Sequence, residues 1–360
     1  MLLKCSADMQ KNMNLKADKL EENDRLFSWC AHTVKVSRRN CVVLMNSASK
    51  FNIVLWGLRA KDYEKLPSLI PEYIKAAMLS AHFSPGVIEK YLTDMGEVTV
   101  CKNSNRSDVT RLNKSVELVS DYTYYVDDYD KEKIYQPHTT KWVNDHTFYS
   151  EEGACQYAVE HFAACLKERY GAPVYYAKMY QLKITLDFPD FEISREVLVP
   201  CDCTFNTLHN VIQKSFNWQG YHMYEFTPEG SNREFVITTQ QMIDEAIDFY
   251  GRDEEYICDS DCTLESVFED YDRILYTYDM GDNWEHEIKL IKTITVNDDP
   301  KIKCLKVTGK APPEDCGGAY GYSDLLARLE QGDEEAAEWA EYMDWRDKTE
   351  RDINFSLSFI

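Results

Sequence analysis

The chain has 360 residues, of which 44% are hydrophobic and 13% aromatic, and its formal net charge is −22. This length exceeds the usual limit for one hydrophobic core, so two domains are expected. No apolar run approaches the roughly 20 residues of a membrane span, and the chain does not begin with the apolar stretch of a signal peptide. The twelve cysteines are scattered, which favours reduced thiols and a cytoplasmic location without a membrane partner.

The negative charge is concentrated in the second half of the chain. Residues 1–180 contain 24 Lys+Arg against 23 Asp+Glu, whereas residues 181–360 contain 16 against 39. Affinity for nucleic acid comes largely from cations that neutralise phosphates, so the second half is not expected to bind DNA or RNA directly. The expected partner is a basic protein or a cationic ligand, because a field of one sign attracts the opposite sign.

The first half is predicted to be an α+β domain. Strands are predicted at Leu2–Cys5, Arg39–Asn46, Phe51–Leu58 and Glu97–Cys101, and helices at Met9–Leu20, Leu66–His82, Val87–Met95, Ser107–Leu112 and Glu151–Arg169. Residues 121–148 are rich in Tyr and Asp without clear periodicity, which predicts an irregular arm. Gly171-Ala172-Pro173 is typical of a helix end. We therefore expect domains at residues 1–172 and 176–360.

The second half is also predicted to be α+β, with a mixed sheet. Its expected strands are Tyr180–Leu186, Ile193–Val199, Tyr221–Phe226, Glu234–Thr238, Arg273–Tyr278, Trp284–Ile294 and Asn354–Ile360. A helix over residues 204–216 is predicted because its apolar residues recur with a period near 3.6 and Thr204 can cap it. The order strand, strand, helix, strands resembles the start of a β-grasp domain. Acidic helices are expected at Leu325–Glu330 and Glu334–Asp344.

Two short stretches of the second half, Tyr276–His286 and Ala311–Gly318, combine a histidine, a tryptophan, several carboxylates and a Pro/Gly-rich loop. Prolines fix φ and glycines allow backbone shapes closed to other residues, so the loop is predicted to hold one conformation. Well-held loops often carry function. With His222 from a neighbouring predicted strand, the candidate binding residues are His222, Asp279, Asp282, Trp284, His286, Glu314, Asp315, Gly317 and Gly318.

The second half resembles the plasmid ORF-3-like family from about Tyr180 to Ile360. The resemblance rests on Leu208-His209, Ile212-Gln213, Trp218, His222–Phe226, Tyr278–His286, Cys304-Leu305, Pro312–Gly318 and Gly321-Tyr322. It adds Tyr322 to the candidate binding residues. Members of the family are often described as TnpR-like passenger proteins of mobile elements, which implies a fold but no settled activity. The TnpR description suggests a resolvase, yet the sequence contains nothing like a serine-recombinase nucleophile site with its arginine cluster.

The first half more distantly resembles a small bacterial domain of unknown function. That domain begins with a Lys-Cys-Thr-Lys-like strand and later has Arg-Ser before a Gly and an Asn. The corresponding residues here are Lys4-Cys5-Ser6-Ala7 and Arg106-Ser107 followed by Asn113, with Thr110 in place of the glycine. This resemblance implies no chemistry.

The histidines allow a metal-site hypothesis. On a strand leaving the turn, Asp282, Trp284 and His286 would share one face. If that face meets His222, two imidazoles and a carboxylate such as Asp282 would suit zinc, manganese or iron. The alternative is a structural hairpin with Trp284 in the core, because the spacing lacks a tight ligand signature such as H-E-x-x-H. No cofactor is therefore expected, and a divalent metal is the alternative.

Two cysteine pairs, Cys201/Cys203 and Cys258/Cys262, could hold zinc only if four thiolates met, and neither has the C-x-x-C spacing. Ordinary thiols are expected instead. The sequence thus predicts a cytoplasmic protein whose second domain is a non-catalytic ligand- or protein-binding module linked to bacterial mobile elements. The alternative is a metal-dependent hydrolase or nuclease at the same His/Asp surface, so the sequence leaves open whether the protein is an enzyme.

Overall fold

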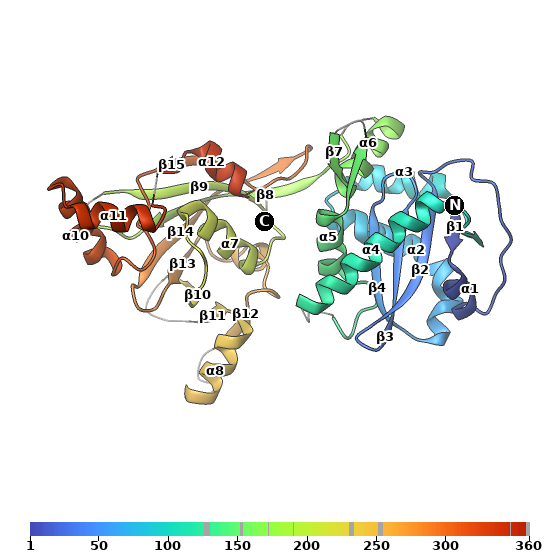
Figure 1. Ribbon diagram of the computed structural model, residues 1–360, viewed down its shortest axis with the longest axis horizontal. Coiled ribbons are helices and arrows are strands. Elements are labelled where there is room, and N and C mark those ends of the chain that lie inside the picture. The colour runs from blue at the N-terminus through green and yellow to red at the C-terminus, as the bar shows by residue number, and fades with distance from the viewer. Residues whose placement is uncertain are drawn as a thin grey trace. The chain divides into compact units, whose positions relative to one another are not determined.

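The computed structural model describes residues 1–125, 130–151, 154–171, 173–189, 191–229, 234–250, 255–345 and 347–357. The chain divides into two compact units, Met1–Tyr176 and Ala177–Ile360 (Figure 1). Each unit combines helices with a mixed β-sheet. The predicted α+β class with two domains is therefore confirmed.

A mixed sheet lies at the centre of the first unit, with the strand order β4-β3-β2-β1-β5. Its strands are β1 (Leu2–Cys5), β2 (Ser28–Val36), β3 (Arg39–Asn46), β4 (Asn52–Leu58) and β5 (Thr99–Lys102). Strand β1 pairs in parallel with β2 and β5, whereas β2, β3 and β4 pair antiparallel. The predicted β3–β4 hairpin is thus confirmed, and β2 is a strand that the sequence analysis missed.

Helices cover both faces of this sheet (Figure 1). They are α1 (Ala7–Asn12), α2 (Ala60–Ser80), α3 (Pro85–Met95), α4 (Arg106–Tyr125), α5 (Pro137–His146) and α6 (Ala158–Tyr170), and a small hairpin of β6 (Phe148–Glu151) and β7 (Ala154–Tyr157) precedes α6. Alternation along β3 explains the two layers. Val42 and Leu44 pack with α2, α3 and α6, while Val43 and Met45 pack with α4 and α5.

Several predicted helix bounds in the first unit are wrong. The helix predicted over Met9–Leu20 ends at Asn12, where Asn14 takes a left-handed φ of 50° that stops the helix. The helix predicted from Ser107 runs on to Tyr125, and Pro137 begins α5, a position where its missing N–H costs nothing. The irregular arm over 121–148 is therefore wrong, and only its residues 126–129 lie outside the described residues. Helix α6 begins at Ala158, later than the predicted Glu151.

The second unit is built on a longer mixed sheet with the order β12-β11-β10-β13-β14-β8-β9-β15. Its strands are β8 (Ala177–Leu186), β9 (Ile193–Pro200), β10 (Tyr224–Pro228), β11 (Val236–Thr238), β12 (Tyr256–Cys258), β13 (Arg273–Tyr278), β14 (Trp284–Val296) and β15 (Lys303–Thr308). The predicted β13–β14 hairpin is confirmed, with Tyr278 opposite Trp284. The start β8, β9, α7, β10 matches the predicted β-grasp-like order.

The helices of this unit are α7 (Phe205–Phe216), α8 (Gln240–Tyr250), α9 (Leu264–Phe268), α10 (Gly318–Glu330), α11 (Glu334–Tyr342) and α12 (Glu350–Leu357). Helix α7 packs its apolar side against the sheet, and Thr204 caps it by accepting a hydrogen bond from the Thr207 N–H at 3.3 Å, as predicted. Helices α8 and α9 and strands β12 and β15 were not predicted. Strands β12 and β15 and helix α9 are three to six residues long, which leaves little periodicity to detect. Helix α8 does carry apolar residues at helical spacing, such as Met242, Ile243, Ala246 and Ile247, and was missed.

The strand predicted over Asn354–Ile360 is wrong. Residues 350–357 form α12 instead, and residues 358–360 lie outside the described residues. The Thr349 N–H donates to Asp352 Oδ2 at 3.0 Å and the Asp352 N–H donates to Thr349 Oγ1 at 3.3 Å, which is a helix-starting capping box. The Asn354 side chain then bonds both the N–H and the carbonyl of Cys304, so α12 closes part of the outer edge of β15.

Candidate functional site

The turn between β13 and β14 is held by one carboxylate. Asp279 Oδ1 accepts hydrogen bonds from the Gly281 N–H at 2.9 Å and the Asp282 N–H at 3.3 Å. Asp279 and Asn283 both take left-handed φ angles, 56° and 54°, which Asp and Asn tolerate better than other side-chain-bearing residues. Asp279 is therefore fixed by its own turn, and its second oxygen, Oδ2, is left to face away from it.

The Ala311–Gly318 loop is bonded to the segment that follows α7. The Trp218 indole N–H donates to the Pro312 carbonyl at 2.9 Å, and the Gln219 N–H donates to Glu314 Oε2 at 2.7 Å. The Tyr278 hydroxyl donates to Glu314 Oε1. Glu314 is only 5% exposed, so this carboxylate holds the loop in place and does not face solvent.

The turn and the loop also contact each other directly. The Gly317 N–H donates to Asp282 Oδ2 at 3.1 Å. Gly317 and Gly318 have φ angles of +86° and +67° and begin α10. Glycine is needed for both angles, and the close approach of Gly318 to Asp282 leaves no room for a side chain. The predicted single conformation of this loop thus has a specific physical basis.

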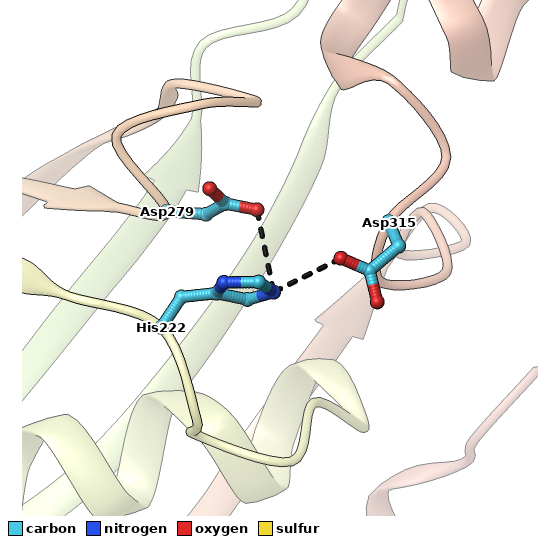
Figure 2. Close-up of side chains that lie close together, drawn as sticks. All are labelled: His222, Asp279 and Asp315. Atoms are coloured by element: carbon cyan, nitrogen blue, oxygen red, sulfur yellow. Dashed lines mark hydrogen bonds and ion pairs between the residues drawn. The ribbon is translucent and has the colours of Figure 1, made fainter.

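Three side chains from three segments meet beside this contact (Figure 2). His222 Nε2 lies 3.0 Å from Asp315 Oδ1 and 3.5 Å from Asp279 Oδ2. One ligand atom from each of the three residues lies within 4.8 Å of the other two. The side chains of Asp279, His222 and Asp315 are 12%, 27% and 48% exposed, so the cluster opens to solvent on the Asp315 side. We call it the His–Asp cluster.

Tyr221 fixes the second oxygen of Asp315. Its hydroxyl donates to Asp315 Oδ2 at 2.6 Å, and this hydrogen bond raises the pKa of Tyr221, so the hydroxyl keeps its proton. Each aspartate therefore has one oxygen held by hydrogen bonds and the other directed at His222 Nε2. The sequence analysis placed Tyr221 at the start of a predicted strand, Tyr221–Phe226, and did not name it as a candidate. Strand β10 begins only at Tyr224, so Tyr221 lies in the loop before it.

His286 and Trp284 lie inside the sheet core and not on this surface. The His286 ring packs against Phe216, Trp218 and Tyr276 at centroid distances of 5.0, 5.5 and 5.3 Å. Its Nδ1 lies 3.1 Å from the Trp284 carbonyl oxygen, and burial lowers the pKa of His286 to about 3. These two candidate binding residues therefore do not lie on a solvent-accessible surface, and Trp284 is in the core, as the structural alternative predicted.

The alternative metal set of His222, His286 and Asp282 is accordingly not assembled. Alternation along β14 does put Trp284 and His286 on one face, but that face points into the core, where both residues are at most 2% exposed. Asp282 remains in the turn and bonds Gly317. Tyr322 is also a core residue, 1% exposed, and its hydroxyl donates to the Lys310 carbonyl at 3.0 Å.

A buried polar layer behind the surface was also missed. The Tyr276 hydroxyl lies 2.9 Å from both His209 Nδ1 and Gln213 Nε2, and the Tyr224 hydroxyl donates to Asp259, which is 3% exposed. Burial lowers the pKa of His209 to about 3, so this ring is neutral. The available signals were tyrosines on neighbouring strands and two polar residues four positions apart on the predicted helix, His209 and Gln213. Neither signal is specific to a polar layer.

The two cysteine pairs lie on adjacent segments. The Leu264 N–H donates to the Cys203 carbonyl at 2.8 Å and the Phe205 N–H donates to the Cys262 carbonyl at 3.0 Å. Within the described part of the chain, the His–Asp cluster is the group of three side chains with metal-ligand spacing, and no cysteine belongs to it. Burial raises the pKa of Cys201 to about 12, which disfavours a thiolate.

These features define a class: a two-domain α+β protein whose acidic second domain carries a loop-built His–Asp cluster. The chain belongs to the family of plasmid pRiA4b ORF-3-like proteins, whose model matches residues 178–358. A second model, a domain of unknown function (DUF6933), matches residues 2–161. Both resemblances inferred from the sequence are thereby confirmed. None of the helices in the described residues has the length and apolar character needed to cross a bilayer.

Two relatives each match about half of the chain. The uncharacterised protein y4hQ of Sinorhizobium fredii (strain NBRC 101917 / NGR234) is 32% identical over 183 residues, which cover 50% of this chain and 88% of that protein. A crystal structure of a protein of unknown function from Methanosarcina mazei Go1 is 27% identical, with a TM-score of 0.40, and the match covers 48% of this chain and 92% of that one.

Proposed function

We propose that the second unit is a non-catalytic binding module and that its ligand is a divalent cation held by His222, Asp279 and Asp315. The observation that carries this proposal is the approach of the three ligand atoms to within 4.8 Å of one another. An ion about 2.0–2.2 Å from each donor would separate its ligand atoms by about 3–4 Å. The 3.0 and 3.5 Å separations of the aspartate oxygens from His222 Nε2 fit that requirement.

The donor set also suggests which cation fits. One imidazole and two carboxylates suit manganese, iron or zinc better than the all-oxygen sites that calcium and magnesium prefer. The donors are preorganised, because the Asp282 N–H and the Tyr221 hydroxyl bond the oxygens that would not contact the ion. The net charge of −22 further raises the local concentration of cations.

Binding is favoured over catalysis by the state of the nearby carboxylates. Glu314 accepts hydrogen bonds from Gln219 and Tyr278, and Asp282 accepts one from Gly317. Among the described residues around the cluster, these carboxylates are engaged in holding the loops, which does not suit a general base. The observation that favours the second candidate, metal-dependent hydrolysis, is the 48% exposure of Asp315, since an ion there could also bind and activate water.

Calorimetric titration of the full chain with Mn²⁺ tests the proposal. Manganese is the better probe because the twelve cysteines could capture zinc. We expect one equivalent to bind, with at least about a tenfold loss of affinity in His222→Gln and Asp315→Asn, whose ligand atoms are removed or weakened. Glu285→Gln, an exposed carboxylate on β14, is the matched control and should bind as the wild type does. Weak sub-stoichiometric binding, or equal affinity in all four proteins, would contradict the proposal.

The same samples separate binding from hydrolysis. Mn²⁺-dependent cleavage of bis-p-nitrophenyl phosphate that disappears in Asp315→Asn and persists in Glu285→Gln would favour the hydrolase.

A link to bacterial mobile elements is supported by the plasmid reading frame after which the family is named. A cytoplasmic location is supported by the described cysteines, which are all free thiols.

A further inference from the structure

A second surface of the same unit lies between α10 and α11. Here a groove of about 410 Å³ is lined by Leu329, Ala337, Ala340, Glu341, Asp344 and Trp345, with Lys310 at its side. We call it the α10–α11 groove. Its floor is apolar, since Leu329 and Trp345 pack on the hydrophobic core and Ala340 is 8% exposed. The alanines of α11 leave the groove open, because they do not fill the space that a longer side chain would occupy.

The walls of the groove are held rigidly. Asp333 caps α11 by accepting hydrogen bonds from the Glu335 N–H at 3.0 Å and the Ala336 N–H at 3.2 Å, and it pairs with Arg328 at 2.7 Å. These contacts fix the turn that joins the two helices. The two helices that form the groove are therefore held at a fixed turn.

Trp345 is fixed at one end of the groove. Its indole N–H donates to the Ala311 carbonyl at 2.7 Å, and its ring packs edge-on against Tyr322 at 5.8 Å. Lys310 Nζ lies 3.6 Å from the ring centroid. Trp345 also lines a narrow cleft of about 40 Å³ together with Tyr221 and Glu314. The α10–α11 groove and the His–Asp cluster are therefore neighbours, but none of the three cluster residues lines the groove.

The α11 side of the groove is strongly acidic, and Lys310 is the one cation among the described lining residues. Residues 334–345 contain five carboxylates and no lysine or arginine. Glu341 and Asp344 line the groove and are exposed, and the Glu335 side chain is 93% exposed. Tyr342, beside them, is 85% exposed. An apolar floor with an acidic rim and an exposed tyrosine has the composition of a protein-binding surface that selects a basic partner.

We infer that the α10–α11 groove docks a basic amphipathic helix of a partner protein. The apolar face of such a helix would cover Leu329, Ala337 and Trp345, and its lysines and arginines would lie opposite Glu341 and Asp344. A groove between two helices accepts a third helix through side chains spaced three and four residues apart. This inference goes beyond cation binding, because the groove uses none of the three side chains of the His–Asp cluster.

Fluorescence anisotropy with the full chain and a labelled synthetic helix tests the inference. The helix has roughly 18 residues, or five turns, with leucines on one face and lysines and arginines on the other. We expect it to bind, and a version with glutamates in place of the basic residues not to bind. The double variant Glu341→Lys/Asp344→Lys should weaken binding at least about tenfold. Asp298→Lys, which changes charge in the turn after β14, should have little effect.

Ala337→Glu distinguishes docking in the groove from a general attraction between opposite charges. The change adds negative charge, so diffuse attraction predicts tighter binding. Docking predicts binding weaker by at least about tenfold, because the new side chain projects from an exposed position on α11 into the groove. Glutamate is a good helix former, so α11 is expected to persist, and circular dichroism checks this.

Three results of the binding experiments would overturn the inference. They are the absence of binding, tighter binding in Ala337→Glu, and equal losses in Asp298→Lys and the double variant. Sedimentation gives a further check, because a wild-type dimer that Ala337→Glu converts to a monomer would mean that a second copy of the chain covers the groove instead of a partner helix.

Discussion

Asp282 and Gly318 lie in direct backbone contact, although they are far apart in the sequence. A Cβ atom on Gly318 would lie 2.6 Å from the Asp282 carbonyl oxygen. One residue earlier, the Gly317 N–H donates to Asp282 Oδ2 at 3.1 Å. Because Asp279 is in the same turn as Asp282, and Asp315 is in the same loop as Gly318, this contact sets the position of the two aspartates relative to each other.

Gly318→Ala is therefore expected to destabilise the second unit and to weaken Mn²⁺ binding. The added methyl group must move the loop or the turn, and the left-handed φ of +67° adds backbone strain. The two effects together should lower the free energy of unfolding by about 2–4 kcal/mol. Denaturant unfolding measures the first effect and calorimetry measures the second.

Gly332→Ala is the control for this substitution. Gly332 has a φ of +76°, but a Cβ atom added there would meet no other atom within 4 Å, so the change carries the backbone strain alone, about 1 kcal/mol. Equal losses of stability in the two variants would show that the Asp282 contact is not tight. Unchanged Mn²⁺ affinity in Gly318→Ala would show that this contact does not position the aspartates of the His–Asp cluster.

The sequence predicted the loops of the candidate site better than the side chains within it. The Pro/Gly composition of residues 311–318 indicated a fixed loop, and its hydrogen bonds to Trp218 and Gln219 agree with that. Alternation along β14 correctly put Trp284 and His286 on one face. It could not say which face, because both residues are compatible with a polar surface and with an aromatic core. This face is in the core because Phe216 and Tyr276, from other segments of the chain, pack against the His286 ring.

The errors in secondary structure have a similar origin. Residues 354–360 read as a strand because their apolar residues alternate, but the Thr349–Asp352 capping box begins a helix just before them. Ile353 and Leu357, four residues apart, are both buried, which is helical spacing. Local start signals and tertiary contacts thus outweighed a short period-two pattern.

The contact between Asp315 and His222 joins residues 93 positions apart, and no local sequence pattern encodes such a contact.

His286 makes the stability of the second unit depend on pH. Burial lowers its pKa to about 3, whereas a histidine in the unfolded chain has a pKa of about 6.5. Below about pH 6.5 the unfolded chain binds a proton that the folded chain does not, so the free energy of unfolding falls as the pH is lowered, by up to about 1.4 kcal/mol per pH unit for this residue.

His286→Phe is expected to remove this contribution while keeping an aromatic ring among Phe216, Trp218 and Tyr276. The slope of unfolding free energy against pH between about pH 6 and 4 should decrease by about 1.4 kcal/mol per unit relative to the wild type. His209, whose pKa burial also lowers to about 3, retains its own share of the slope in both proteins. Above about pH 7.5 the stability difference between the two should be constant. Parallel curves over the whole range would mean that the pKa of His286 is the same in the folded and the unfolded protein.

Asp108 stabilises the first unit through a buried ionic cluster. Its fully buried carboxylate lies 2.6 Å from Lys4 Nζ and 2.7 Å from an Arg25 nitrogen, and Lys50 Nζ lies 3.3 Å away. Burial acts to raise the pKa of Asp108, but the hydrogen bonds from Lys4 and Arg25 outweigh it and hold the pKa below its usual value. The stability from this group is present above the unfolded pKa and is lost as the pH falls through the lower folded value.

Asp108→Asn should therefore lower the unfolding free energy of the first unit by about 3 kcal/mol at neutral pH, since it leaves buried cations without their partner. Hydrogen exchange of the β1 amides reports on this unit. Asp145→Asn, which breaks the exposed pair with Lys141 at 3.2 Å, should change the exchange little. Similar effects of the two substitutions would mean that the desolvation of Asp108 cancels its ion pairs.

Mn²⁺ should stabilise the second unit against unfolding if the His–Asp cluster holds it. A ligand that binds only the folded state at one hundred times its dissociation constant adds about 2.7 kcal/mol to the unfolding free energy. Thermal unfolding with increasing Mn²⁺ should follow that dependence, and EDTA should reverse it. Mn²⁺ should add little stability to Asp315→Asn, because this substitution weakens the ligand that lies 3.0 Å from His222. Mn²⁺ should add as much stability to Glu285→Gln as to the wild type. Equal stabilisation of Asp315→Asn would assign the ion to other carboxylates of this acidic unit. No stabilisation of the wild type would mean that His222 and its two aspartates are held together without a metal ion.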